Sequence, residues 1–164
     1  MAKKILAVGL KKVSYAVVSE SGIPLSFTDI DVIHNDTFEY SNTEATYEDY
    51  INMLTKKRYY RRKTEDSEST VTFSIGAYDF DLKKVFMGGT ATATTWTPAT
   101  DGGEINLAIR VVTEDGVQIT FPYASISASH TRNQSALGLT ITASPIEHPD
   151  GETASEEWEI LEEG

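Results

Sequence analysis

The sequence predicts a mainly β protein whose antiparallel strands are accompanied by one short helix. Apolar and polar residues alternate with a period of two in several segments of the second half, which is typical of strands with one buried face. Turn signals separate these segments at the spacing of hairpins. One short segment interrupts them with apolar residues at helical spacing. We therefore expect a sheet against which a single helix packs.

The first half of the chain contains weaker signals. Residues 13–19 predict a strand, and residues 27–33 and 37–40 are compatible with strands. Residues 46–54 (TYEDYINML) combine apolar side chains at helical spacing with a weak capping box, so a helix and a loop with a strand both stay open there. From about residue 34 to 69 the chain is a long polar excursion, and such a segment in a compact domain is usually functional or ordered by a partner.

The one helix is predicted directly after a strand at residues 69–77. Asp79 is a suitable N-cap, and Gly88 can supply a left-handed C-terminal cap. The apolar stripe between these caps consists of Leu82, Val85 and Phe86. About two turns of helix are too short to be stable alone, so we expect the helix to cover one end or one face of the sheet.

The second half of the chain predicts a hairpin and a further strand. Residues 105–112 and 117–121 are expected to pair, because Asp115-Gly116 between them is a strong hairpin-turn signal. Pro122 has no N–H to donate to a ladder, so it predicts a bulge, an edge or a change of sheet. The alternation resumes after this proline and predicts another strand at 136–146.

Length and composition fit one domain with an acidic C-terminal segment. A chain of 164 residues with 40% hydrophobic residues is long enough to bury a core. We assign residues 1–151 to a single β domain, and residues 152–164 to an acidic tail or a last strand. The apolar stretch near the start is short for a signal peptide, and no segment approaches the roughly 20 apolar residues of a membrane span. We therefore expect folding in a cytoplasm and no membrane partner.

No constellation of catalytic or metal-binding residues is evident in the sequence. Cysteine is absent, which excludes disulfides, thiolate metal sites and cysteine nucleophiles. His34, His130 and His148 are isolated from one another and are expected at the surface. The glycine-rich segments 87–90 and 101–103 lack the lysine and the spacing of a phosphate loop, and they predict turns. We expect no enzyme activity, no cofactor, no metal and no small-molecule substrate.

Charge is unevenly distributed along this acidic chain. The net charge is -11, yet six of the 14 basic residues lie in 56–63 (KKRYYRRK), which leaves eight basic against 25 acidic residues elsewhere. Residues 147–164 contain eight acidic residues and no basic one. A solvated loop tip, an acidic protein surface and nucleic acid are the three alternatives for the basic stretch, and its tyrosines are typical of protein interfaces. The candidate inter-subunit contact consists of Lys56, Lys57, Arg58, Tyr59, Tyr60, Arg61, Arg62 and Lys63.

An ordered series of motifs runs through the second half of the chain. A strand, a short helix and a GGT ending occupy 70–90 (TVTFSIGAYDFDLKKVFMGGT), and a linker with one residue between Trp96 and Pro98 follows at 93–99 (ATTWTPA). A hairpin with a charged DG turn and an FP-x-A-x-I continuation spans 107–128, and a strand ending in a Thr-Ala-x-Pro-type signature spans 137–146. In this order the four segments resemble the tail tube (major tail) proteins of long-tailed bacteriophages, whereas residues 1–69 match only in outline.

The resemblance implies a β-sandwich or small barrel closed by one short helix, a tail tube-like fold. It also implies a virion structural protein that is assembled in the bacterial host cytoplasm, forms stacked hexameric rings with copies of itself, and contacts other tail proteins. DNA would pass through the hollow tube only as cargo. Type VI secretion tube proteins and contractile-phage inner tubes share the fold, so these relatives stay open.

The residues add three expectations to this resemblance. Strands 117–128 and 136–143 have polar Thr/Ser faces and few charged gatekeepers, which would leave an edge able to pair with a neighbouring copy. The acidic background would give an electronegative lumen that repels DNA, which carries one negative charge per roughly 1.7 Å of its axis. The basic stretch 56–63 would lie in an extended loop away from the lumen and meet carboxylates of an adjacent subunit or ring, such as those of 152–163 or 65–68.

Two alternatives stay open, one from another class of protein and one of the same fold. A β-sandwich binding module, for carbohydrate or with an adhesin-like role, would need aromatic residues on one sheet face, and Trp96, Trp158, Tyr123 and Tyr78 are the candidates. Another tail protein of the same fold, such as a tail terminator, would form one ring and stop.

Overall fold

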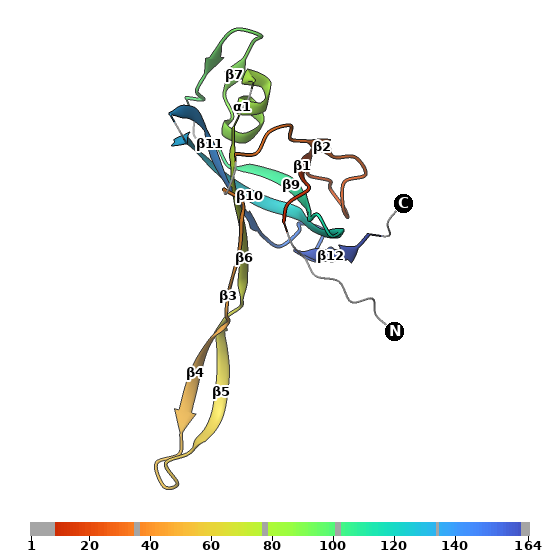
Figure 1. Cartoon of the computed structure of the whole chain (residues 1–164). Helices are drawn as coiled ribbons and strands as arrows, with labels where there is room; N and C mark the ends of the chain where they lie inside the picture. The colour runs from red at the N-terminus through yellow and green to blue at the C-terminus, as the bar shows by residue number, and fades with distance from the viewer. Residues whose placement is uncertain (1–8, 35–36, 77–78, 101–102, 134, 162–164) are drawn as a thin grey trace.

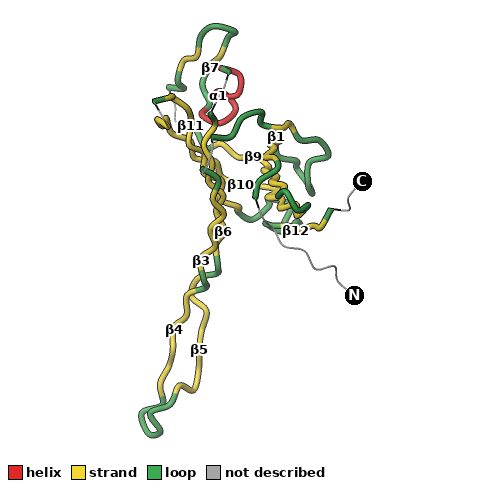
Figure 2. Tube along the Cα trace, viewed as in Figure 1, coloured by secondary structure: helices red, strands yellow, loops and turns green. Residues whose placement is uncertain are grey.

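An elongated arm extends from a β-rich body in the computed structural model, as Figure 1 and Figure 2 show. The structure describes residues 9–34, 37–76, 79–100, 103–133 and 135–161. Strands account for 53% of the described residues and helix for 6%, which confirms the predicted mainly β class. In chain order the elements are β1 (Lys12–Val17), β2 (Thr28–Asp29), β3 (Glu39–Thr43), β4 (Thr46–Ile51), β5 (Arg58–Glu65), β6 (Glu68–Ile75), α1 (Phe80–Met87), β7 (Thr90–Ala91), β8 (Trp96–Thr97), β9 (Ile105–Val112), β10 (Val117–Asn133), β11 (Ala136–Pro145) and β12 (Glu157–Ile160).

Antiparallel pairing joins most strands of the body into one sheet, whose order is β2-β1-β9-β10-β11-β6-β3. β9 lies along one side of β10, whereas the other side of β10 pairs first with β12 and then with β11. The register shifts between Phe121 and Ala124, beside Pro122, because proline cannot donate to the ladder. The irregularity predicted at Pro122 is thus confirmed. The antiparallel strands pack together around a common core, which is consistent with a β-sandwich.

The core is filled by alternating residues of the central strands. The predicted buried face of β6 is confirmed, because Val71, Phe73 and Ile75 have no exposed surface. In β9 both faces are covered, since Ala108 and Val112 are buried together with the alternate apolar residues of that strand. Each fully buried aliphatic or aromatic side chain of this kind stabilises the fold by about 1.5–3 kcal/mol.

Helix α1 forms between the predicted caps and covers one end of the body (Figure 1). The Asp79 carboxylate accepts the backbone N–H of Leu82 at 2.7 Å. Gly88, with a φ of 75°, donates its N–H to the Lys84 carbonyl at 2.8 Å. Phe86 is buried, and its ring meets the Tyr15 ring edge-on with centroids 5.3 Å apart. This contact anchors the short helix to β1, as its length requires.

The expectation that 117–128 and 136–143 leave a free edge is wrong. β10 is paired on both sides at Gln118–Thr120 and at Ala124–Ile126, and β11 is paired on both sides at Leu139–Ala143. Polar Thr and Ser at alternate positions show which face of a strand is polar, but the hydrogen-bonding edge lies at right angles to that face. Among the described strands of the main sheet, β2, β3 and β12 each pair on one side only.

The segments whose secondary structure the sequence did not decide form strands or short turns. Residues 46–54 form β4 and the start of a turn, so the helical alternative does not apply. Residues 27–33 contain only the two-residue strand β2, and 37–40 overlap the start of β3. In the acidic segment 152–164, Glu157–Ile160 form β12. The turn expected at 101–103 falls mostly on residues outside those described.

His148 is buried, so the expectation that it lies at the surface is wrong. Its ring packs edge-on against Tyr123 with centroids 5.6 Å apart, and its Nδ1 accepts the backbone N–H of Asp150 at 3.1 Å. The turn that continues to Gly151, with a φ of 73°, carries the ring onto the sheet. Sequence neighbours alone do not reveal this, because the covering residue comes from β10. His130 is exposed as predicted, although it lies in β10.

Asp150 ties the C-terminal segment to the loop that follows β1. Its carboxylate accepts the backbone N–H of Gly22 at 3.0 Å and the N–H groups of Glu152 and Thr153, each at 2.9 Å. It also accepts the Thr153 hydroxyl at 2.6 Å. Hydrogen bonds from Thr153 and the surrounding backbone hold the pKa of Asp150 well below its usual range, because they stabilise the charged form.

The lowered pKa of Asp150 predicts acid-sensitive stability. The ionised carboxylate favours the folded state at pH values above the unfolded pKa of about 3.9, and this contribution is lost as the pH falls below that value. Asp150→Asn should therefore lower Tm at pH 7, and the difference from the wild type should shrink between about pH 4 and pH 2. Thermal unfolding followed by circular dichroism over this pH range measures the difference in Tm, and Glu20→Gln, at an exposed position, is the control. A Tm difference that does not change with pH would contradict the prediction.

Candidate assembly interface

The arm comprises residues 44–67 and contains a separate two-stranded sheet of β4 and β5 (Figure 1, Figure 2). It continues from β3 and β6, whose register runs up to the pair Thr43 and Glu68 at the base of the arm. No residue of the arm is buried, and all of β5 is exposed. Both faces and both outer edges of this ribbon are therefore open to solvent.

The candidate contact residues 56–63 lie at the tip of the arm and along β5. The expectation of a loop is correct only for Lys56 and Lys57, because the strand begins at Arg58. The antiparallel register places Glu48 opposite Arg62 and Asp49 opposite Arg61. The sequence contained a signal for this pairing, because Glu48 and Asp49 lie as far before the turn as the two arginines lie after it.

The arm itself supplies partners for much of its positive charge. Asp49 forms ion pairs with Arg58 and Arg61, each at 3.4 Å, and Glu48 pairs with Arg62 at 3.2 Å. Lys63 pairs with Asp66 at 3.1 Å, so one carboxylate expected from a neighbouring copy is an intrachain partner. Pairs as exposed as these contribute only about 0–1 kcal/mol each.

Aromatic contacts run along the same ribbon. The Arg61 guanidinium lies 3.9 Å from the centroid of the Tyr47 ring, and the rings of Tyr50 and Tyr60 are 5.7 Å apart. Tyr59 is 67% exposed and Tyr60 is 55% exposed. These side chains present amphipathic surface of the kind that is enriched in protein interfaces.

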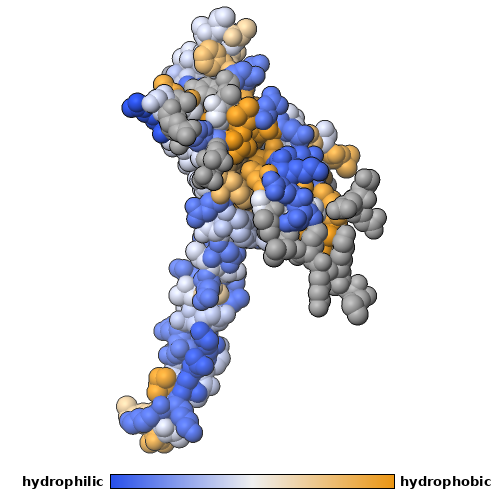
Figure 3. Space-filling model, in the orientation of Figure 1, coloured by the Kyte–Doolittle hydropathy of each residue, from blue (hydrophilic) through white to orange (hydrophobic). Residues whose placement is uncertain are grey.

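The arm tip, residues 51–57, exposes apolar side chains. Met53 is 79% exposed and Leu54 is 91% exposed, and Figure 3 shows hydrophobic surface at this end of an otherwise hydrophilic arm. Asn52 organises the turn: its side chain accepts the N–H of Leu54 at 2.9 Å, and its backbone N–H donates to Lys57 at 2.8 Å. Lys56 and Lys57 form no ion pair in the described structure. The tip therefore presents apolar surface beside two uncompensated positive charges.

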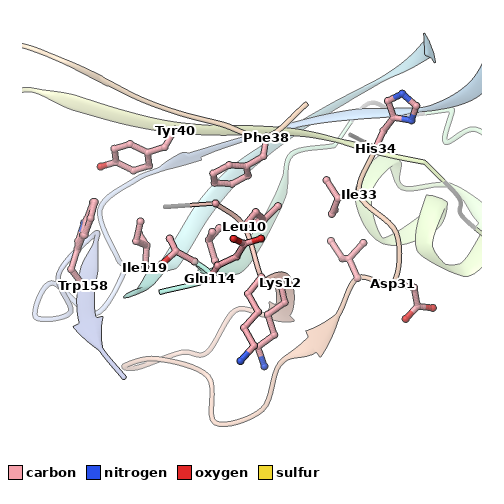
Figure 4. Close-up of a pocket in the computed structure, with 15 residues that line it drawn as sticks. Leu10, Lys12, Asp31, Ile33, His34, Phe38, Tyr40, Glu114, Ile119 and Trp158 are labelled. Carbon is pink, nitrogen blue, oxygen red and sulfur yellow. The ribbon is translucent and has the colours of Figure 1, made fainter. Parts of the chain in front are cut away.

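The body carries a groove of about 820 Å³ between β3 on one side and β1, β9, β10 and β12 on the other (Figure 4). Its apolar lining consists of Leu10, Ile30, Ile33, Phe38, Tyr40, Val111, Ile119 and Trp158. The Tyr40 hydroxyl and the Trp158 Nε1 both donate to the Glu156 carboxylate, at 2.5 and 2.8 Å, which fixes one end of the groove. His34 also lines it and is half-buried, contrary to the surface position expected.

The aromatic residues considered for a ligand-binding face lie at separate places. Trp96 donates to the Gly88 carbonyl at 3.0 Å beside α1, Trp158 packs edge-on against Tyr40, and Tyr123 contacts His148. Tyr78 lies outside the described residues. Within the described part of the chain, no group of three or more His, Cys, Asp or Glu residues is arranged so that it could hold a metal ion, and no helix has the length and apolar character needed to cross a bilayer. No model of a known protein family matches the chain, and no curated protein matches it significantly.

The exposed position of the arm predicts that the body folds without it. Replacing residues 44–67 by Asn-Gly would join Thr43 to Glu68, which already face each other, through a two-residue hairpin turn. Because the arm buries no residue, the free energy of unfolding should stay within about 1 kcal/mol of the wild type. Urea unfolding measures this value. A loss of more than about 3 kcal/mol, or a chain that does not fold, would show that the arm is part of the body's stability.

Proposed function

We propose that this protein is the structural subunit of a phage tail tube and that it assembles with copies of itself into stacked rings. The observation that carries the proposal is the arm: a two-stranded ribbon with no buried residue and with exposed Met53 and Leu54 at its tip. An isolated two-stranded hairpin is at best marginally stable in water. A partner that covers the arm would supply the missing apolar burial, and a neighbouring subunit is the partner that a tube provides.

The distribution of charge supports self-association through the arm. The arm contains six basic and five acidic residues, whereas the rest of the chain contains eight basic and 20 acidic residues. Two bodies therefore repel each other, but the basic tip of one arm is attracted to another body. Such a contact joins unlike surfaces, and repeated contacts of that type generate closed rings or open filaments.

The same charge balance supports a conduit for DNA. A body with a large excess of carboxylates repels a polyanion and leaves it free to slide, whereas a basic wall would bind it. The resemblance of residues 70–146 to tail tube proteins adds the expectation of hexameric rings around an electronegative lumen. This resemblance runs over β6, α1, the β9–β10 hairpin and β11.

Negative-stain electron microscopy of concentrated protein tests the proposal. We expect the wild type to form rings and tubes, and the variant with Asn-Gly in place of 44–67 to stay monomeric although it folds. Lys56→Gln combined with Lys57→Gln should weaken assembly and its sensitivity to salt, because this change leaves the ion pairs of β5 intact. Lys84→Gln, an exposed lysine on α1, is the matched control.

Other outcomes of this experiment would identify the alternatives. Single rings that never stack would indicate a tail terminator. Unchanged assembly of the double lysine variant, together with lost binding to duplex DNA, would assign the basic stretch to nucleic acid. A wild type that stays monomeric at every concentration and in every salt would contradict the proposal.

A further inference from the structure

The arm tip needs an acceptor that offers both apolar and acidic surface. Ile51, Met53 and Leu54 are 57%, 79% and 91% exposed, and Lys56 and Lys57 follow them within the same turn. The turn is ordered by the hydrogen bond from the Lys56 N–H to the Asn52 carbonyl at 2.7 Å, and Lys56 has a φ of 62°. A surface that fits this tip must combine an apolar recess with nearby carboxylates.

The groove on the body supplies the apolar recess. Phe38 and Tyr40 project into it from the β3 side, and Leu10, Ile119 and Trp158 face them from the opposite side (Figure 4). Trp158 is 52% exposed, which leaves a large aromatic surface without cover. A volume of about 820 Å³ is within the range of sites that enclose ligands of several hundred daltons. The groove is thus large enough for the side chains of an inserted turn.

Carboxylates border one end of this groove. Asp31 lines both the groove and an adjoining cavity of about 440 Å³, which is also lined by Asp29, Asp79 and Asp81. Lys12 pairs with Asp29 at 3.9 Å, but the other three aspartates form no ion pair in the described structure. Burial, Asp79 and Asp81 together raise the pKa of the nearby Tyr15, because a negative field disfavours a second negative charge.

The rim of the groove carries charges of both signs. Glu114 lines the groove beside Gly9 and forms no ion pair among the described residues, and Lys11 is likewise without one. The aspartate cluster (Asp29, Asp31, Asp79 and Asp81) gives the adjoining cavity a net negative charge even with Lys12 counted. A partner with lysines next to apolar side chains would therefore be oriented, with the lysines toward the cluster and the apolar side chains in the groove.

We propose that this groove and the aspartate cluster form the acceptor site for the arm tip of a second copy. Met53 and Leu54 enter the groove, and Lys56 and Lys57 face Asp31, Asp79 and Asp81. The chain cannot fill its own site, because the arm leads away from the body along β3 and β6 (Figure 1). The inference rests on the proposed self-assembly and names the surface that receives the arm.

Cross-linking on the cysteine-free chain tests this acceptor directly. Leu54→Cys protein is mixed with Glu114→Cys protein and oxidised mildly, and the disulfide-linked heterodimer is followed by non-reducing electrophoresis and mass spectrometry. We expect it to form at least about tenfold faster than in a mixture of Leu25→Cys and Glu114→Cys, because docking raises the effective concentration of the thiols. Leu25 is fully exposed on the body, so it matches Leu54 in access to solvent.

A charge exchange checks the orientation of the tip. Lys56→Asp with Lys57→Asp in the Leu54→Cys chain should abolish the excess cross-linking, and Asp31→Lys with Asp81→Lys in the Glu114→Cys chain should restore it. If the lysine changes abolish the excess cross-linking and the aspartate changes do not restore it, the assignment of the aspartates is overturned. Far-UV circular dichroism confirms that each variant is folded, and Lys11→Cys, which also lines the groove, replaces Glu114→Cys as the acceptor thiol if that variant is not.

Two results would overturn the inference while leaving the tail tube proposal intact. In one, the wild type forms tubes but Leu54→Cys cross-links no faster to Glu114→Cys than the control does. In the other, an Ile5→Cys, Glu114→Cys chain closes an intramolecular disulfide in dilute solution and tip cross-linking is absent, which would assign the groove to the N-terminal residues of the same chain. A wild type without any assembly would contradict both proposals at once.

Discussion

A β-ribbon of two strands has no second layer on which to bury a face, and this constraint governs the arm. Its ion pairs and ring contacts lie within the arm, none of those between described residues joins the arm to the body, and exposed contacts of this kind contribute little. The base of the arm is held by the pairing of β3 with β6. The body is organised around its own core of fully buried side chains from β6, β9, β10 and β11. The core of the body therefore stabilises the fold, and the surface of the arm is free to contact a partner.

The division of the chain into an acidic body and an arm with a basic tip would give the proposed self-association a direction. Contacts between identical surfaces would bring like charges together, whereas a tip that enters the groove of another copy joins apolar surface to apolar surface and lysine to aspartate. An interface between unlike surfaces leaves one unused arm and one unused groove at the ends of any open chain of subunits. The separation of an acidic body from a basic arm tip would thus support both the growth of an assembly and an electronegative interior.

The sequence predicted the parts of the fold that local chemistry determines. Asp79 and Gly88 bound the helix as expected, because capping depends on hydrogen bonds within a few residues, and Pro122 interrupts the ladder because it has no N–H. Long-range features were not predictable in this way. The free edges expected in β10 and β11 are occupied, and His148 is covered by Tyr123, because both outcomes depend on which strands become neighbours. The basic stretch was evident from composition, but the groove was not, since Leu10, Phe38, Ile119 and Trp158 are far apart in the chain.

Amide hydrogen exchange in dilute and in concentrated protein tests most directly whether a partner orders the arm. If a partner orders the arm, the paired amides of β4 and β5 exchange almost as fast as in an unstructured chain when the protein is dilute. In assembled protein their exchange should slow by at least about tenfold, while the amides of β9 and β10 stay protected in both states. Equal protection of the arm in both states, or an unprotected arm within tubes that microscopy shows to be complete, would contradict the account.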